Sequence, residues 1–174
     1  MRKLLFTIIL VANYVYPTGA TATFKPISEW QGVVTHVSDG DTLFVRPASG
    51  GQPVKIRIDG LDAPEICQSY GPASRQALQN RVMGQQVEVD TRRRDNFGRV
   101  LARISLQQAD VGEWMVRQGH AWSYRFRRDA GPYAAEEVQA KTAQRGLFAD
   151  AWALPPREFR KRHGPCQEGG TTSR

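Results

Sequence analysis

The chain contains 174 residues, of which 40% are hydrophobic and 24% charged, and it carries a net charge of +7. Its single apolar stretch lies near the N-terminus, which argues against a protein with several membrane-spanning helices. The two cysteines, Cys67 and Cys166, form no CxxC pair and lack the histidine spacing that would complete a zinc site. The basic excess suits a polyanionic partner.

The first residues have the features of an export signal. A basic start is followed by an apolar run of about a dozen residues, well short of the roughly 20 that a membrane-spanning helix needs. Ala20 and Ala22 have the small side chains that a signal peptidase accepts. We therefore predict a signal peptide over 1–22 and an exported protein, periplasmic or secreted, without stable membrane insertion.

The rest of the chain is expected to form one domain and a tail. Residues 23–154 have the length of a single domain, whereas 155–174 is basic and then rich in glycine, threonine and serine. We predict that this C-terminal part is loosely ordered. Arginines cluster at 92–94, 125–128 and 157–162, where they suit a polyanion or else form solvated faces of a basic protein.

The first predicted elements are three strands separated by turns. Segments 30–37 and 42–47 are rich in β-branched and aromatic residues and flank the turn sequence SDGD. Apolar and polar residues alternate over 54–58, so this strand places Arg57 on its polar face.

A helix follows, with Pro72 near its first turn and Gly84 at its end. The later predicted elements are two strands and then two helices, at 85–91, 98–106, 109–119 and 131–146. Five short strands with long-range closure predict an α+β protein, a five-stranded OB-type β-barrel with three helices.

Acidic and basic side chains converge on one edge of this predicted barrel. Asp41 closes the first turn, and Asp62 and Glu65 follow the strand that carries Arg57. Carboxylate oxygens with a nearby backbone carbonyl favour Ca²⁺ or Mg²⁺ over zinc. Arg57 and Arg99 are suited to bind a phosphodiester, because a guanidinium can bind two phosphate oxygens at once.

Each of these residues also has a simpler interpretation. Asp-Gly is a common hairpin turn signal, so Asp39 and Asp41 could serve the turn alone. Asp62 or Glu65 alone could stabilise the start of a helical turn, and an isolated arginine on a strand could be a surface residue. The joint pattern favours a reactive site.

The motifs DGDT, RIDGLDAPE, YGP, DNFGR and VRQG, spread over about 33–147, resemble the staphylococcal (micrococcal) nuclease, or thermonuclease, family. The resemblance implies a five-stranded OB barrel with three helices. It also implies cleavage of DNA and RNA with one Ca²⁺, leaving 3′-phosphate ends.

The resemblance assigns roles to six positions. It implies that two aspartates and one backbone carbonyl bind the metal, that one glutamate is the general base, and that two arginines bind phosphate. These residues are, in that order, Asp41, Asp62, Ala63, Glu65, Arg57 and Arg99.

The chain departs from the family pattern in three places. Ala63 replaces a threonine, but the expected ligand is a backbone carbonyl. The loop from Glu65 to Tyr70 is shorter and contains Cys67. The two nucleotide-contacting tyrosines of the family fall near Tyr124 and Phe126, so one tyrosine is replaced.

Further expectations concern substrate contacts, the pairing of the two cysteines and the oligomeric state. Arg92 and Arg127 are predicted to bind nucleic acid. Export favours a disulfide between Cys67 and Cys166, although one buried and one free cysteine is the alternative. We expect a monomer with DNA and RNA as substrates. The competing hypotheses are a non-catalytic OB-fold nucleic-acid-binding protein and an exported basic protein that binds anionic surface polymers.

Overall fold

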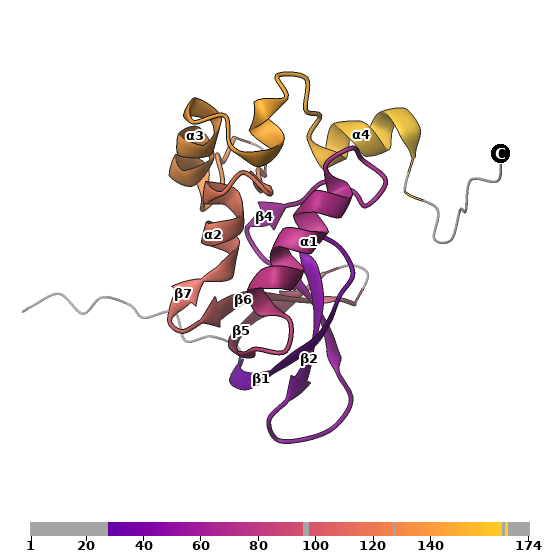
Figure 1. The fold of residues 1–174 in the computed structure, drawn as a ribbon. Coiled ribbons are helices and arrows are strands. Elements are labelled where there is room, and N and C mark those ends of the chain that lie inside the picture. Colours follow the sequence, from indigo (N-terminus) through magenta and orange to yellow (C-terminus); the bar gives the residue numbers. More distant parts are fainter. Residues whose placement is uncertain (1–27, 96–97, 127, 165, 167–174) are drawn as a thin grey trace, which may run out of the picture.

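A computed structural model describes residues 28–95, 98–126, 128–164 and 166 (Figure 1). The predicted signal peptide and the position of Arg127 lie outside these residues. Among the described residues, none of the helices combines the length and hydrophobicity required to cross a bilayer.

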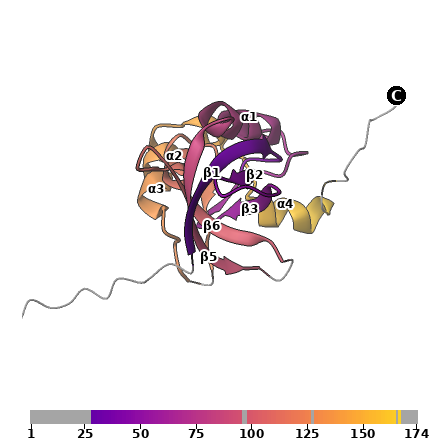
Figure 2. The ribbon, with the colours of Figure 1, turned by 90° about the horizontal axis from the view of Figure 1, so that it is seen from below.

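Five strands form a closed barrel of the OB type, and the sequence predicts the five strands and this type of barrel. Their hydrogen-bonded order is β3-β2-β1-β5-β6, and a parallel pairing of β3 with β6 closes the ring. Figure 2 shows these strands curving around a common interior. They are β1 (Ser28–Val37), β2 (Thr42–Pro47), β3 (Val54–Ile58), β5 (Gln86–Arg94) and β6 (Val100–Leu106).

The alternation of the strands builds the core of the barrel. Leu43, Val45, Ile56, Ile58 and Ile104 are all at most 1% exposed. Residues between them point outward, so each strand presents one apolar face to the interior. The α+β OB-type barrel predicted from this alternation is confirmed.

Helices and short strands surround the barrel. The helices α2 and α3 lie together at one end, and α1 lies along the barrel wall (Figure 1). The remaining elements are β4 (Leu61–Asp62), α1 (Gly71–Val82), β7 (Ala109–Asp110), α2 (Val111–Arg117), β8 (Trp122–Ser123), α3 (Ala134–Thr142), a 3-10 turn (Gly146–Ala149) and α4 (Pro156–His163).

Helix α4 corrects the expectation of a loosely ordered tail that begins at residue 155. Two consecutive prolines followed by basic residues predict a tail, but Pro156 occupies the first turn of this helix, where its missing N–H costs nothing. Basic residues fill the last turn, where they interact favourably with the helix dipole. The described part of the chain thus has one α-helix more than predicted.

The predicted disulfide between Cys67 and Cys166 is confirmed. The two Cα atoms lie 5.8 Å apart, across a sequence separation of 99 residues. It joins the segment before α1 to the segment after α4.

Glu137 fixes α3 to β8 and to the residues that follow β8. Its carboxylate accepts hydrogen bonds from the Ser123 backbone amide at 2.9 Å and from the side chains of Arg125 and Lys141. Burial alone would raise the pKa of Glu137, but the hydrogen bonds from Lys141, Arg125 and Ser123 together lower it. The ionised carboxylate therefore stabilises the fold.

We expect Glu137→Gln to lower the free energy of unfolding at pH 7 by about 2 kcal/mol, because charge-assisted hydrogen bonds are lost. The folded-state pKa is lowered, so this stabilisation is complete above the unfolded-state pKa and disappears as pH falls through the folded-state value. Urea unfolding of both proteins between pH 7 and pH 3 measures the difference. A difference that stays constant over this range would contradict the role of the carboxylate.

Candidate active site

The SDGD sequence forms a turn, as predicted, and the turn presents Asp41. The Ser38 amide donates to the Thr42 carbonyl at 2.9 Å, and the Asp41 amide donates to the Asp39 carboxylate at 3.0 Å. Gly40 is required because a Cβ there would lie 2.0 Å from the Ser74 hydroxyl oxygen on α1. This close approach fixes the turn against the helix.

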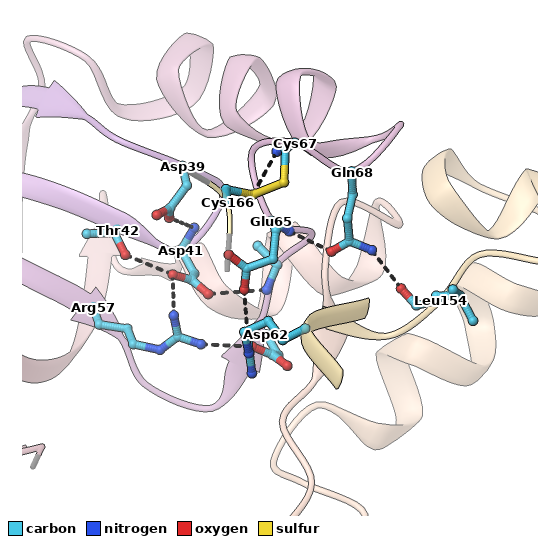
Figure 3. A network of polar contacts seen from close by, with 12 residues as sticks. Asp39, Asp41, Thr42, Arg57, Asp62, Glu65, Cys67, Gln68, Leu154 and Cys166 are labelled. Carbon is cyan, nitrogen blue, oxygen red and sulfur yellow. Dashed lines mark hydrogen bonds and ion pairs between the residues drawn. A yellow bond between two sulfur atoms is a disulfide. The ribbon is translucent and has the colours of Figure 1, made fainter. Parts of the chain in front are cut away.

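Strand register brings Arg57 to Asp41. Thr42 on β2 lies opposite Arg57 on β3, so the guanidinium reaches the carboxylate that precedes Thr42. Arg57 Nη1 lies 2.7 Å from Asp41 Oδ1, and Nη2 lies 2.8 Å from Asp62 Oδ1. Figure 3 shows the guanidinium joining the two carboxylates.

Two more contacts orient the Asp41 carboxylate. The Thr42 hydroxyl donates to Oδ1 at 2.9 Å, and the Ala63 amide donates to Oδ2 at 3.2 Å. Asp62 and Ala63 are placed by β4, which pairs with β8 so that Asp62 lies opposite Trp122. The structure therefore brings the three predicted metal-binding residues together.

The carboxylates outnumber the cations in this buried group. Burial raises the pKa of Asp62 to about 6, although the charge of Arg57 opposes this. Burial and the neighbouring Asp41 raise the pKa of Asp39 to about 7. The guanidinium of Arg57 is shared between the carboxylates of Asp41 and Asp62, so an additional cation would stabilise their ionised forms.

The donor set fits a hard divalent cation. Asp41 and Asp62 provide oxygen ligands, and Ala63 has a backbone carbonyl next to them in the chain. Over the described ranges, no group of three or more His, Cys, Asp or Glu side chains could hold a metal ion. The predicted set is compatible with this result because it uses only two side chains.

A cleft of about 770 Å³ opens beside these carboxylates. Its lining includes five of the predicted residues, Arg57, Asp62, Glu65, Arg99 and Tyr124. Tyr124 directly follows β8 and is 43% exposed. These five residues bring two arginines, two carboxylates and an aromatic ring to the cleft, the chemistry expected for binding and hydrolysing a phosphodiester.

Arg99 enters the cleft from the hairpin between β5 and β6. Its Nε lies 2.6 Å from Asp95 Oδ2, and its backbone amide donates to Asp95 Oδ1 at 2.9 Å. The parallel pairing of β3 with β6 places Arg57 opposite Leu101, two residues beyond Arg99. Barrel closure is therefore what brings the two predicted phosphate-binding arginines to one cleft.

Glu65 lies in the loop between β4 and α1. Its backbone amide donates to Gln68 Oε1 at 2.7 Å, and Gln68 Nε2 donates to the Leu154 carbonyl at 3.0 Å. The Glu65 carboxylate forms an ion pair with Arg160 of α4. A loop side chain is thus fixed by its own neighbours and by the C-terminal helix.

Comparison with known proteins decides the family. A model of the family described as "Staphylococcal nuclease homologue" matches residues 55–150. The chain belongs to the staphylococcal nuclease family. It is therefore a nuclease, a hydrolase of phosphodiester bonds, from a family whose nucleases are generally metal-dependent.

Several relatives cover most of the chain. Protein ParB of Escherichia coli is 34% identical over 82% of this chain and 86% of its own length. An uncharacterized endonuclease of Escherichia coli is 35% identical over 75% of this chain and 85% of its own length. Micrococcal nuclease of Shigella flexneri is 30% identical over 77% of this chain and 82% of its own length.

Two predicted substrate contacts of the nuclease do not reach the cleft. Neither Phe126, which is 61% exposed, nor Arg92 is among the described residues that line it. Arg92 pairs with Asp90 at 2.8 Å. The pairing of β5 with β6 shifts between Thr91 and Arg93, and this bulge at Arg92 changes which side chains face the cleft.

Arg93 and Arg94, which follow Arg92 in the chain, line the cleft that Arg92 was expected to line. Arg93 also pairs with Asp59 at 3.1 Å. Sequence analysis identified this arginine cluster but could not locate the bulge, since an unpaired strand residue leaves no mark in the pattern.

Arg93→Ala should weaken binding of an oligonucleotide in chelator and lower the salt dependence by about one unit of slope, as expected for one lost phosphate contact. Arg92→Ala removes the same charge from the neighbouring position and is the matched control. Fluorescence anisotropy over a salt series measures both. Equal effects of the two substitutions would show that only the overall charge matters.

The sequence gives no indication of Gln68, and it places Arg160 only within the basic cluster at 157–162, not at the active-site loop. Arg160 lies 95 residues from Glu65, and no motif connects them. The predicted pairing of Cys67 with Cys166 was the one signal that the C-terminal segment returns to this loop.

Proposed function

We propose that the protein is an exported, Ca²⁺-dependent nuclease that cleaves DNA and RNA and leaves 3′-phosphate ends. One observation carries the proposal. Arg57 binds both Asp41 and Asp62 and lines the same cleft as Glu65 and Arg99. This arrangement combines a cation site, a proton acceptor and two phosphate-binding groups.

Asp41, Asp62 and the Ala63 carbonyl would hold one Ca²⁺. All three offer hard oxygen ligands, which suit Ca²⁺. When bound, the ion would neutralise charge on a phosphate oxygen and orient a water. The two buried carboxylates of Asp41 and Asp62, which share one guanidinium, support the assignment.

The protein side chains have distinct roles in the proposed reaction. Arg57 and Arg99 bind oxygens of the scissile phosphate and stabilise the charge that develops on them. Glu65 accepts a proton from the attacking water. Water attacks phosphorus in line, the bond between phosphorus and the 5′ oxygen breaks, and the 5′ oxygen leaves and takes up a proton from solvent, which gives a 3′-phosphate and a 5′-hydroxyl. Tyr124 provides a ring on which a base can stack.

Export and a monomeric state are part of the proposal. The features of residues 1–22 support a signal peptide that ends before Thr23. A disulfide is typical of proteins in oxidising compartments such as the periplasm or the medium. Mass spectrometry of exported protein would locate the N-terminus.

The activity is tested by incubating the protein that starts at Thr23 with plasmid DNA and with RNA, in Ca²⁺, in Mg²⁺ and in chelator. We expect degradation in Ca²⁺ that chelator abolishes. Asp41→Asn tests the cation site, with Asp129→Asn, an exposed aspartate, as the control. Binding without degradation under all conditions would favour a non-catalytic nucleic-acid-binding protein.

A further inference from the structure

Helix α4 is a basic helix whose position the hydrophobic core does not explain. Of its described residues only Pro156 is buried, and the last turn contains Arg160, Lys161, Arg162 and His163. Figures 1 and 2 both show α4 on a different side of the barrel from α2 and α3. Burial of an apolar face, the usual source of helix stability in proteins, is minor here.

Covalent and polar contacts hold α4 instead, and they reach the loop that carries Glu65. These contacts are the Cys67–Cys166 disulfide, the hydrogen bond from Gln68 to the Leu154 carbonyl, and the ion pair of Glu65 with Arg160 (Figure 3 for the loop and the disulfide). The position of α4 is therefore set by the active-site loop.

Arg160 extends from α4 into the catalytic cleft. It lines the cleft together with Arg57 of β3 and Arg99 of the hairpin between β5 and β6, and Arg93 and Arg94 at the end of β5 line it as well. Cationic side chains thus come from three parts of the structure, the barrel, the hairpin and α4. Such a cleft concentrates positive potential where a polyanion would enter.

We propose that Arg160 is a substrate-binding residue. When nucleic acid binds, the guanidinium of Arg160 gives up its ion pair with Glu65 and pairs with a phosphate of the nucleic acid. The disulfide holds α4 in position for this contact. The inference rests on the proposed function. A guanidinium fork fits carboxylate and phosphate oxygens alike, so Arg160 keeps an ion pair throughout the exchange. The exchange leaves the Glu65 carboxylate available to accept a proton.

The ligand of Arg160 is a phosphodiester next to the scissile one. Arg57 and Arg99 serve the scissile phosphate, and Arg160 approaches the same cleft from the separate helix α4. Consecutive phosphates of one strand would then contact different elements of the protein. The contact positions the strand and is independent of base sequence.

The test compares Arg160→Ala with Arg162→Ala in the disulfide-bonded protein. Both remove one charge from α4, but Arg162 is not among the described residues that line the cleft. Affinity for a fluorescent single-stranded oligonucleotide is measured in chelator over a salt series. We expect Arg160→Ala to weaken binding about 10-fold or more, with a salt slope lower by about one unit. KM for cleavage should rise, with little change in the saturated rate.

Identical affinity and salt slope for the two variants would overturn the proposal. Faster cleavage by Arg160→Ala than by the wild type at low substrate concentration would also overturn it, because Arg160 would then only mask Glu65. If the wild type binds the oligonucleotide but never cleaves it, the proposed function fails. A selective loss of affinity in Arg160→Ala would in that case still support the phosphate contact.

The role of the disulfide is tested in a variant of the protein that lacks both cysteines. The double substitution of Cys67→Ser with Cys166→Ser releases α4, so adding Arg160→Ala there should have a much smaller effect than in the bonded protein. Circular dichroism checks that this variant is folded, and mild reduction of the bonded protein gives a second route to the same state. An undiminished Arg160→Ala effect in either state would show that the disulfide does not position the arginine.

Discussion

Glu65→Gln is expected to lower the single-turnover cleavage rate by roughly 10² to 10⁴, the usual contribution of a positioned general base. The amide keeps the shape of the side chain but cannot accept the proton from water. Affinity for nucleic acid should stay similar or rise, because a negative charge leaves the cleft and the ion pair to Arg160 weakens. Rates at saturating DNA and affinities in chelator separate the two effects.

Glu158→Gln is the matched control for Glu65→Gln. Glu158 lies on α4, pairs with Lys161 and is not among the described residues of the cleft. The substitution removes the same charge near the same helix, so its cleavage rate should remain close to that of the wild type. If Glu65→Gln also cleaves at the wild-type rate, the general-base role is wrong, and the metal with Arg57 and Arg99 must carry the reaction.

The barrel could be predicted because short, local sequence patterns specify its strands and turns. Alternation over 54–58 and the SDGD turn define strands whose apolar faces can only be buried together. Helix α4 was missed because the contacts that order it come from residues distant in the sequence. A double proline and a run of basic residues indicate a tail, and the contacts that order the helix come from a loop about 90 residues earlier.

For the candidate site, too, the positions that depend on local sequence could be predicted and those that depend on distant contacts could not. The position of Arg57 beside Asp41 follows from strand register, which a turn and an alternating pattern determine. Arg92 was assigned to the substrate as a member of the basic cluster at 92–94, and the bulge after Thr91, which the sequence does not reveal, changes which arginines of that cluster face the cleft. Arg160 belongs to the basic cluster at 157–162, but only the cysteine pairing indicated that this cluster returns to the active-site loop.

Arg57→Lys is expected to lower the saturated cleavage rate about 10² to 10³, the usual cost of one lost donor to a transition-state oxyanion. Lysine keeps the charge but lacks the fork that binds Asp41 and Asp62 at the same time. Arg103→Lys, an exposed arginine on β6, makes the same exchange away from the cleft lining and should leave the rate unchanged.

Arg57→Met removes the charge as well and should reduce stability strongly. Breaking a buried ion pair from one side typically costs about 3 to 5 kcal/mol, because the remaining carboxylates lose their partner. Ca²⁺ should restore more stability to Arg57→Met than to the wild type, since the ion replaces the missing positive charge between Asp41 and Asp62. Urea unfolding with Ca²⁺ and with chelator measures this difference. If Ca²⁺ stabilises neither protein, then Asp41 and Asp62 do not form a cation site, and their pairing with Arg57 serves the fold alone.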